Sequence, residues 1–223
     1  MPPPTKVFPK AIELLAEKSF WVAMWQTVYG WALSILGAAI IAVPLGAFLG
    51  RNRFADGSSK LLIDVVRAVP TVALLPLGLI LLGASQDLKI ILVGAACIWP
   101  LTVQVTQGVK DIDPVTADMG RGFRFSTWQN FKWILVPSVG IYLSSGLRVV
   151  SVLGLFAVLG IELIGGISGL GYRMAVAQEV GNSILLLAYV VWTTVLAVIV
   201  NTAVVTGENK LFHWHSSRRP AND

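Results

Sequence analysis

The sequence predicts an all-α fold, a polytopic transmembrane helical bundle with about five spans. Its 223 residues are 55% hydrophobic and only 13% charged, whereas soluble domains carry about 25% charged residues. Five long stretches hold no charge or a single Arg: 19–50, 68–86, 90–109, 133–161 and 180–207. Each is long enough for a helix to cross an apolar core of about 30 Å. Transmembrane β-strands would instead be short segments of alternating polarity, a pattern that this sequence lacks.

The helical spans are expected at 25–50, 61–84, 88–109, 136–161 and 183–206. They form a transmembrane domain over 21–209, which a tail at 210–223 follows. Residues 1–20 combine prolines with charges and have no short apolar core before a cleavage site, so they do not resemble a signal peptide. A short amphipathic helix lying on the membrane at about 9–18 is the expectation for this segment.

The distribution of Lys and Arg predicts the orientation in the cell (inner or plasma) membrane. In one orientation the cytoplasmic segments hold Arg51, Arg53, Lys60, Lys110, Arg121, Arg124, Lys132, Lys210, Arg218 and Arg219. The outer segments then hold only Lys6, Lys10, Lys18, Lys89 and Arg173. Because positive residues are enriched in cytoplasmic loops, we expect the amino terminus outside and the carboxyl terminus in the cytoplasm. The charges form no cluster typical of nucleic-acid binding.

The loop at 110–135 is expected to form two short cytoplasmic helices. Asp113 can cap the first helix, and Pro114 suits its first position. An apolar stripe of residues four apart follows: Val115, Met119 and Phe123. The second helix starts at Ser126, where Gln129 three residues later completes a capping box. One face of this second helix carries Trp128, Phe131 and Leu135, before Pro137 opens the fourth span.

An apolar stripe on a loop exposed to water is expected to pack against another surface. The stripe either packs against the protein's own helix ends or the lipid headgroups, or it inserts into a groove of a cytoplasmic partner. The spacing of the residues leaves both interpretations open.

Three segments resemble one family. Residues Ala117–Pro137, ADMGRGFRFSTWQNFKWILVP, resemble the EAA loop of ABC importer permeases. Within that family, RAVPTVALLPLGLILLG in Leu62–Gly83 and ELIGGISGLGY in Glu162–Tyr172 resemble signatures of the branch for sulfonates, taurine, nitrate and thiamine-precursor pyrimidines. The resemblance covers about residues 25–206 and begins at the second span of the family pattern.

The loop departs from the family pattern at three positions. Asp118 stands where the family usually has Glu, Gly120 where it has Ala, and Arg124 where it has a Gly in the turn. These departures favour pairing with a different permease chain that carries a more typical loop.

The resemblance implies that the complete importer consists of several chains with different roles. ATP and Mg would be bound by separate ATPase subunits, so no cofactor is expected in this chain, and the sequence contains no G-x-x-x-x-G-K-[ST] motif. A second permease chain, identical or not, and an extracytoplasmic substrate-binding protein would complete the importer. The resemblance assigns coupling to the ATPase to six loop residues: Val115, Asp118, Met119, Arg121, Phe123 and Arg124.

Two ionisable residues and two glycines are candidates for the translocation pathway or gate. Arg148 lies roughly 16 Å along a helix from Pro137, at a depth where a charge normally faces a cavity or a partner. It is expected to give the pathway a cationic lining or to bond carbonyls freed at helix breaks. Glu162 lies about 21 Å further along and is expected to bond backbone groups of the segment 165–171. There Gly169 and Gly171 indicate either a gate of non-helical backbone or an ordinary tight turn.

The leading hypothesis is therefore the permease of an ATP-driven importer for a small solute, which is either an anion such as a sulfonate or nitrate, or a heterocycle. A non-transporting scaffold is the alternative that the atypical loop favours. An ion-driven secondary transporter commonly carries inverted repeats and intramembrane carboxylates, which this sequence does not suggest. An enzyme is not expected, and His213 and His215 indicate an interfacial tail rather than a metal site.

Overall fold

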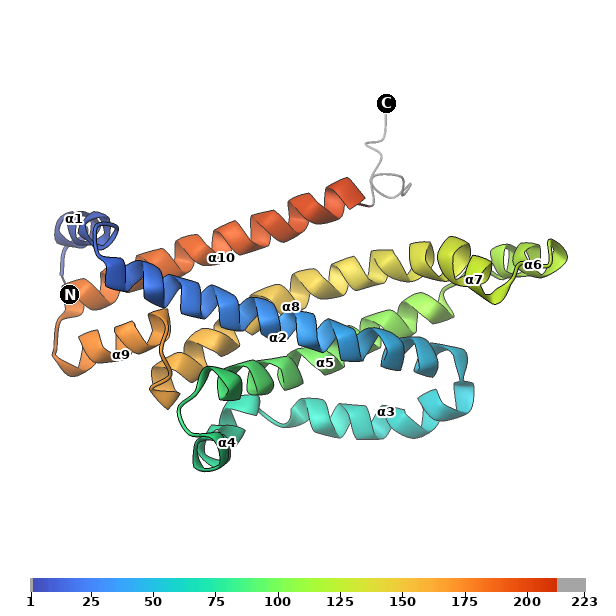
Figure 1. Cartoon of the computed structure of the whole chain (residues 1–223), viewed down its shortest axis with the longest axis horizontal. Coiled ribbons are helices and arrows are strands. Elements are labelled where there is room, and N and C mark those ends of the chain that lie inside the picture. Colours follow the sequence, from blue (N-terminus) through green and yellow to red (C-terminus); the bar gives the residue numbers. More distant parts are fainter. Residues whose placement is uncertain (1, 212–223) are drawn as a thin grey trace.

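The computed structural model describes residues 2–211, and within this range every regular element is helical (Figure 1). In chain order the elements are α1 (Pro4–Leu14), α2 (Lys18–Arg51), α3 (Arg53–Ala68), the 3₁₀ turn η1 (Thr71–Leu74), α4 (Leu75–Leu82), α5 (Gln86–Lys110), α6 (Pro114–Gly122), α7 (Thr127–Asn130), the π-helical turn η2 (Phe131–Leu135), α8 (Val136–Gly165), α9 (Leu170–Glu179) and α10 (Ser183–Leu211). Four of the helical segments are long and apolar enough to cross a membrane, or five if one bent pair counts as a span. The predicted all-α bundle is confirmed. Most of the tail, with both histidines, lies outside the described residues.

The expected second span is the one that differs most from a single helix. The segments Phe54–Arg67 and Thr71–Leu82 meet at an angle of 70°. Pro70 explains the break, because proline disfavours helical backbone at the residue before it and cannot donate a backbone hydrogen bond. Val69 accordingly adopts extended backbone, with φ −74° and ψ 115°. The prediction of one helix over 61–84 is therefore wrong.

The fourth span also begins earlier than predicted. The helical path runs without interruption from Thr127 to Gly165, so the second loop helix and the fourth span are one rod. Pro137 does not open a new helix. Its ring would crowd the carbonyl of residue 133 in a regular α-helix, and the wider π-helical turn η2 occupies this stretch. Such turns commonly interrupt α-helices as single-turn bulges.

The helices group their connections at two ends (Figure 1). One end, called the α9 end, holds α1, α9 and the turns before α5 and α10. The other, called the α6 end, holds α6, α7 and the turn between α2 and α3. The loop segments that the sequence assigned to one side of the membrane thus lie together. The assignment of the α6 end to the cytoplasm stays a prediction.

The longest helix, α2, packs most extensively on α5. Its buried face carries small residues at intervals of four: Gly30, Ser34, Ala38, Ala42 and Gly46. Small side chains let helix backbones approach closely in a membrane bundle. At Gly46 the two helices come so close that a Cβ atom added to the glycine would lie 2.7 Å from Cβ of Val105 and 2.8 Å from the Thr102 carbonyl oxygen.

The amino-terminal helix docks on the bundle. It spans Pro4–Leu14 rather than the expected 9–18, and Val7, Ala11 and Leu14 are buried. The indole nitrogen of Trp192 on α10 donates a 2.8 Å hydrogen bond to the Ala11 carbonyl. Phe8 and Ile12 are exposed on the opposite face. One apolar face of α1 is thus covered by α10. The exposed face, with Phe8 and Ile12, is available to a lipid surface.

The contact at Gly46 generates a stability prediction. We expect Gly46→Ala to lower the free energy of unfolding by about 1–3 kcal/mol, because the added methyl must displace a backbone carbonyl and a β-branched side chain. The melting temperature of the purified protein in detergent measures this effect.

Gly37→Ala, on the same helix, is the matched control. A Cβ at Gly37 meets no atom within 4 Å, so the higher helix propensity of Ala should leave stability unchanged or raise it by up to about 1 kcal/mol. Equal melting temperatures for the two variants would contradict the close contact.

Candidate functional site

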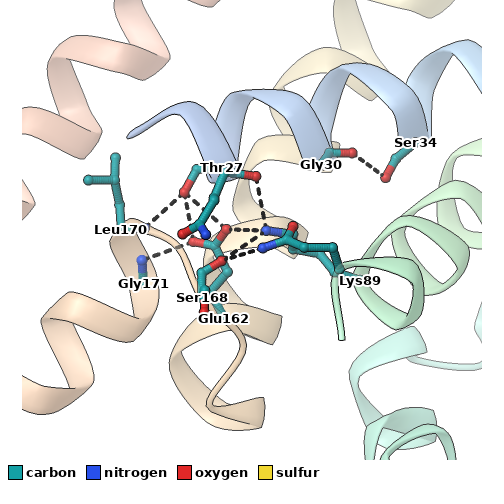
Figure 2. A network of polar contacts seen from close by, with 10 residues as sticks. Thr27, Gly30, Ser34, Lys89, Glu162, Ser168, Leu170 and Gly171 are labelled. Atoms are coloured by element: carbon teal, nitrogen blue, oxygen red, sulfur yellow. Dashed lines mark hydrogen bonds and ion pairs between the residues drawn. The ribbon is translucent and has the colours of Figure 1, made fainter. Parts of the chain in front are cut away.

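A buried ion pair lies at the α9 end of the bundle (Figure 2). The Nζ atom of Lys89, in the first turn of α5, lies 2.7 Å from Oε1 of Glu162, near the end of α8. Neither side chain has any solvent exposure. Because an unpaired charge in a low-dielectric interior is costly, each of these residues depends on the other.

Backbone carbonyls complete the surroundings of the Lys89 ammonium. It donates to the Gln26 carbonyl on α2 at 3.1 Å and to the Ser168 carbonyl at 3.3 Å. With the carboxylate of Glu162, this gives one acceptor for each of its three protons. The single ammonium therefore connects α2, α5, α8 and the turn between α8 and α9.

The Glu162 carboxylate is saturated in the same way. The hydroxyl of Thr27 lies 3.0 and 2.9 Å from its two oxygens, and the backbone N–H of Gly171 donates to Oε2 at 3.0 Å. Thr27 also accepts the backbone N–H of Leu170 at 2.9 Å. The predicted bond from Glu162 to the glycine-rich segment is confirmed, and the carboxylate thereby fixes the first turn of α9.

The glycine at 169 is required by space. A Cβ on Gly169 would overlap the Glu162 carboxylate. Its backbone is extended, which any residue can adopt, so strain is not the reason for the glycine. Gly171 is also closely approached, by Cβ of Glu162 and the Leu159 carbonyl. The two glycines permit a tight turn that is tied to a buried ion pair.

Sequence reasoning missed two members of this network. Lys89 was assigned to an outer loop because it lies at the edge of an apolar stretch, yet its side chain is fully buried. Thr27 was not distinguished from other hydroxyl residues in the spans. The available signal was that Lys89 begins an otherwise uncharged run through residue 109, where a charge normally requires a partner.

Arg148 lies far from this network, between α8 and α10. Its guanidinium contacts the carboxylate of Glu208, whose side chain is only 2% exposed and also accepts a 3.1 Å hydrogen bond from Ser144. The partner of Arg148 is therefore a carboxylate, whereas backbone carbonyls freed at helix breaks were one of the two expectations. Glu208 was overlooked because it lies two residues beyond the predicted end of the last span.

At the α6 end, α6 and α7 form the predicted helical hairpin. Asp113 caps α6 by accepting the Val115 N–H at 3.1 Å, and Ser126 with Gln129 forms the predicted capping box. Trp128 and Phe131 are exposed and their rings stack 5.6 Å apart, whereas Leu135 is buried in the core.

The predicted apolar stripe of α6 faces outward. Val115, Met119 and Phe123 are 64%, 56% and 71% exposed. On the opposite face Gly120 is buried against Asn130 and Ile134, so the hairpin packs on itself and leaves the stripe uncovered. Asp118 and Arg121 form an exposed ion pair of 3.3 Å beside the stripe.

Arg124 adopts left-handed backbone with φ 52°. This conformation ends α6 and suits glycine better than a residue with a Cβ, at a difference of about 1 kcal/mol. The turn therefore has the geometry that the family pattern supplies with Gly, although this chain supplies Arg.

Comparison with known proteins gives one family and several relatives. The family described as "Binding-protein-dependent transport system inner membrane component" matches residues 42–213. The taurine transport system permease protein TauC of Escherichia coli is 25% identical over 220 residues, covering 96% of this chain and 80% of the relative. The bicarbonate transport system permease protein CmpB of Synechocystis is 28% identical, covering 66% and 54%.

Solved structures share the fold. The methionine ABC transporter MetNI in an inward-facing conformation matches with a TM-score of 0.75 at 15% identity, over 86% of this chain and 95% of that chain. An amino acid ABC transporter matches with a TM-score of 0.69 at 14% identity, over 86% and 94%.

The buried ion pair generates a second prediction. Lys89→Met or Glu162→Gln alone should lower the free energy of unfolding by about 3–5 kcal/mol, because each leaves its partner buried without compensation. The double variant should lose less than either single one. A double-mutant cycle of melting temperatures in detergent measures the coupling between the two residues.

The exposed pair of Lys10 and Glu13, 2.9 Å apart, provides the comparison. Lys10→Met should change the melting temperature little, since exposed pairs contribute little. Additive losses at Lys89 and Glu162 would contradict a mutual dependence.

Proposed function

The chain belongs to the family of binding-protein-dependent transport system inner membrane components, and from this premise we propose how it works as an ABC importer permease. In this proposal it forms half of the translocation pathway and couples to a separate ATPase through the loop at 113–131. Its relatives are permeases rather than enzymes, and ATP and Mg are bound by the partner ATPase.

The single observation that carries the coupling proposal is the uncovered stripe of α6. Three large apolar side chains, Val115, Met119 and Phe123, lie more than half exposed on a hairpin at the tip of the bundle (Figure 1). Such a stripe suits insertion into a groove of another protein. Asp118, Arg121 and Arg124 border the stripe and supply polar contacts to the rim of that groove.

Orientation and partners follow from the same arrangement. The α6 end faces the cytoplasm, where ATP is available, and carries the excess of Lys and Arg. The α9 end faces outward and receives solute from an extracytoplasmic binding protein. A second permease chain, either a copy of this one or a different one, supplies the other half of the pathway.

The α8–α9 turn is the proposed outer gate element. Gly169 and Gly171 permit its tight backbone, and Glu162 holds it to α2 and α5 through Thr27 and Lys89. A turn tied to three helices moves with them as one body, so opening at this end requires the helices to rotate. Arg148, which is paired with Glu208, is better suited to joining α8 to α10 than to lining the pathway.

The proposed solute is small: an anion such as a sulfonate or nitrate, with a heterocycle as the other class. The support comes from relatives named for taurine, nitrate and bicarbonate. The atypical residues of the loop favour one alternative, a scaffold chain that binds the ATPase without transporting.

The coupling proposal is tested by Met119→Asp. A carboxylate in an apolar groove should weaken association with the cognate ATPase at least about tenfold, measured by co-purification from detergent and by ATP-dependent uptake in proteoliposomes. Val180→Asp is the control, because Val180 is also more than half exposed, at 70%, but lies at the α9 end.

Unchanged association of the Met119→Asp chain would remove the coupling role of α6. A wild-type chain that binds the ATPase but gives no ATP-dependent uptake would support the scaffold.

A further inference from the structure

Arg67, in the last turn of α3, lies where two cavities meet. The first, of about 300 Å³, opens between α3, α5 and the end of α2, and its lining includes Asp64, Arg67 and Lys110. The second, of about 570 Å³, is an open cavity bordered by α3, η1, α5 and α8, and its lining includes Arg67, Thr71 and Trp99. We call them the α6-end cavity and the mid-helix cavity. Because Arg67 borders both, the two cavities adjoin each other along the face between α3 and α5.

The mid-helix cavity lies near the centre of the bilayer. Its wall on α5 includes Trp99 and Pro100, the middle of a helix that runs from Gln86 to Lys110. Trp99 is therefore roughly 16 Å along the helix from Lys110, about half the thickness of an apolar core. Apart from Arg67 and Thr71, the wall is formed mostly by aliphatic and aromatic side chains.

Within residues 2–211, the Arg67 guanidinium has neither an ion pair nor a hydrogen bond, and the residue is exposed. Asp64, one turn away on α3, lines only the α6-end cavity and forms no ion pair with it. The neighbouring Lys110 is already paired with Asp56 at 2.6 Å. A charge at this depth is tolerated only when it faces water or a partner, and the two cavities supply a place for water.

The second deep arginine is in a different situation. Arg148 is matched by Glu208 on the side of α8 that faces α10, and neither residue lines either cavity. An anion at Arg148 would have to compete with a buried carboxylate. Among the described residues that line the two cavities, Arg67 carries the positive charge that no carboxylate pairs.

We propose that Arg67 is the anion-binding residue of the translocation pathway, which rests on the importer function proposed above. The solute class is a small molecule with one oxyanion group, either carboxylate, sulfonate or nitrate. The guanidinium donates in a planar fork that matches two oxygens of such a group. Thr71, four residues on, contributes a hydroxyl, and the wall around Trp99 packs against the apolar remainder.

The bend at Pro70 forms part of the cavity wall. In a straight helix Thr71 would lie one turn beyond Arg67 on the same face, and at the 70° break the two residues still border the same space. Val69 and Pro70, at the break itself, line that space as well.

A labelling experiment on the full chain in inside-out membrane vesicles tests the proposal. Thr71→Cys places a thiol in the mid-helix cavity, and the wild type gives the background, since Cys97 is buried. Reaction rates are measured with an anionic sulfonatoethyl and a cationic trimethylammonioethyl methanethiosulfonate. We expect the anionic-to-cationic rate ratio to fall about tenfold in Arg67→Gln, because one unit charge at contact distance acts oppositely on the two reagents.

Two variants, each combined with Thr71→Cys, separate charge from structure. Arg67→Lys should keep most of the ratio, since the positive charge is restored. Arg148→Gln combined with Glu208→Gln removes the other deep pair without leaving a buried charge and should leave the ratio unchanged. Size-exclusion chromatography of each variant establishes that it is folded.

A thiol at position 71 that neither reagent labels, or a ratio that Arg67→Gln does not change, would overturn the proposal. The labelling needs neither ATP nor an ATPase, so its outcome is independent of the coupling test. An intact ratio shift with failed coupling would refute the importer mechanism and leave the anion site standing.

Discussion

The cost of leaving a charge uncompensated among apolar helices determines how the two ends of this bundle are built. Lys89 and Glu162 have no solvent exposure and are compensated by each other, by Thr27 and by backbone groups of α2, of the α8–α9 turn and of α9. Such a pair contributes little net stability compared with an apolar pair of the same volume. The pair instead fixes how the helices are placed relative to one another, because no rotation of a single helix can satisfy both charges elsewhere.

This constraint gives the α9 end and the α6 end different properties. At the α9 end the polar groups are internal, so α2, α5, α8 and the start of α9 form one connected body (Figure 2). At the α6 end the hairpin places apolar side chains outward and closes only on itself. A rigid body at one end and an uncovered stripe at the other are what a subunit needs if force applied to the hairpin is to move the opposite end.

The α3–η1–α4 segment departs from both patterns. It contacts the rest of the bundle far less than α2, α5 or α8 do, and most of its apolar side chains, such as Leu61, Ile80 and Leu81, are exposed. Three of its charged residues, Asp56, Asp64 and Arg67, line the α6-end cavity beside α5. A weakly packed, bent segment beside these cavities suits the solute contact proposed above.

Composition and spacing by themselves determined that the chain spans a membrane as helices, where most spans lie, and where the hairpin at 113–131 caps its helices. These features are local: an apolar run of sufficient length, or an Asp, Ser or Pro at a helix start, acts within a few residues. The tertiary structure alone decided that Lys89 is buried with Glu162, that Arg148 pairs with Glu208, and that Arg67 borders a hollow at the break before Thr71. The partners in the two pairs are 73 and 60 residues apart. Only the packing of the helices decides which charges meet, because a single sequence does not indicate which faces of distant helices contact each other.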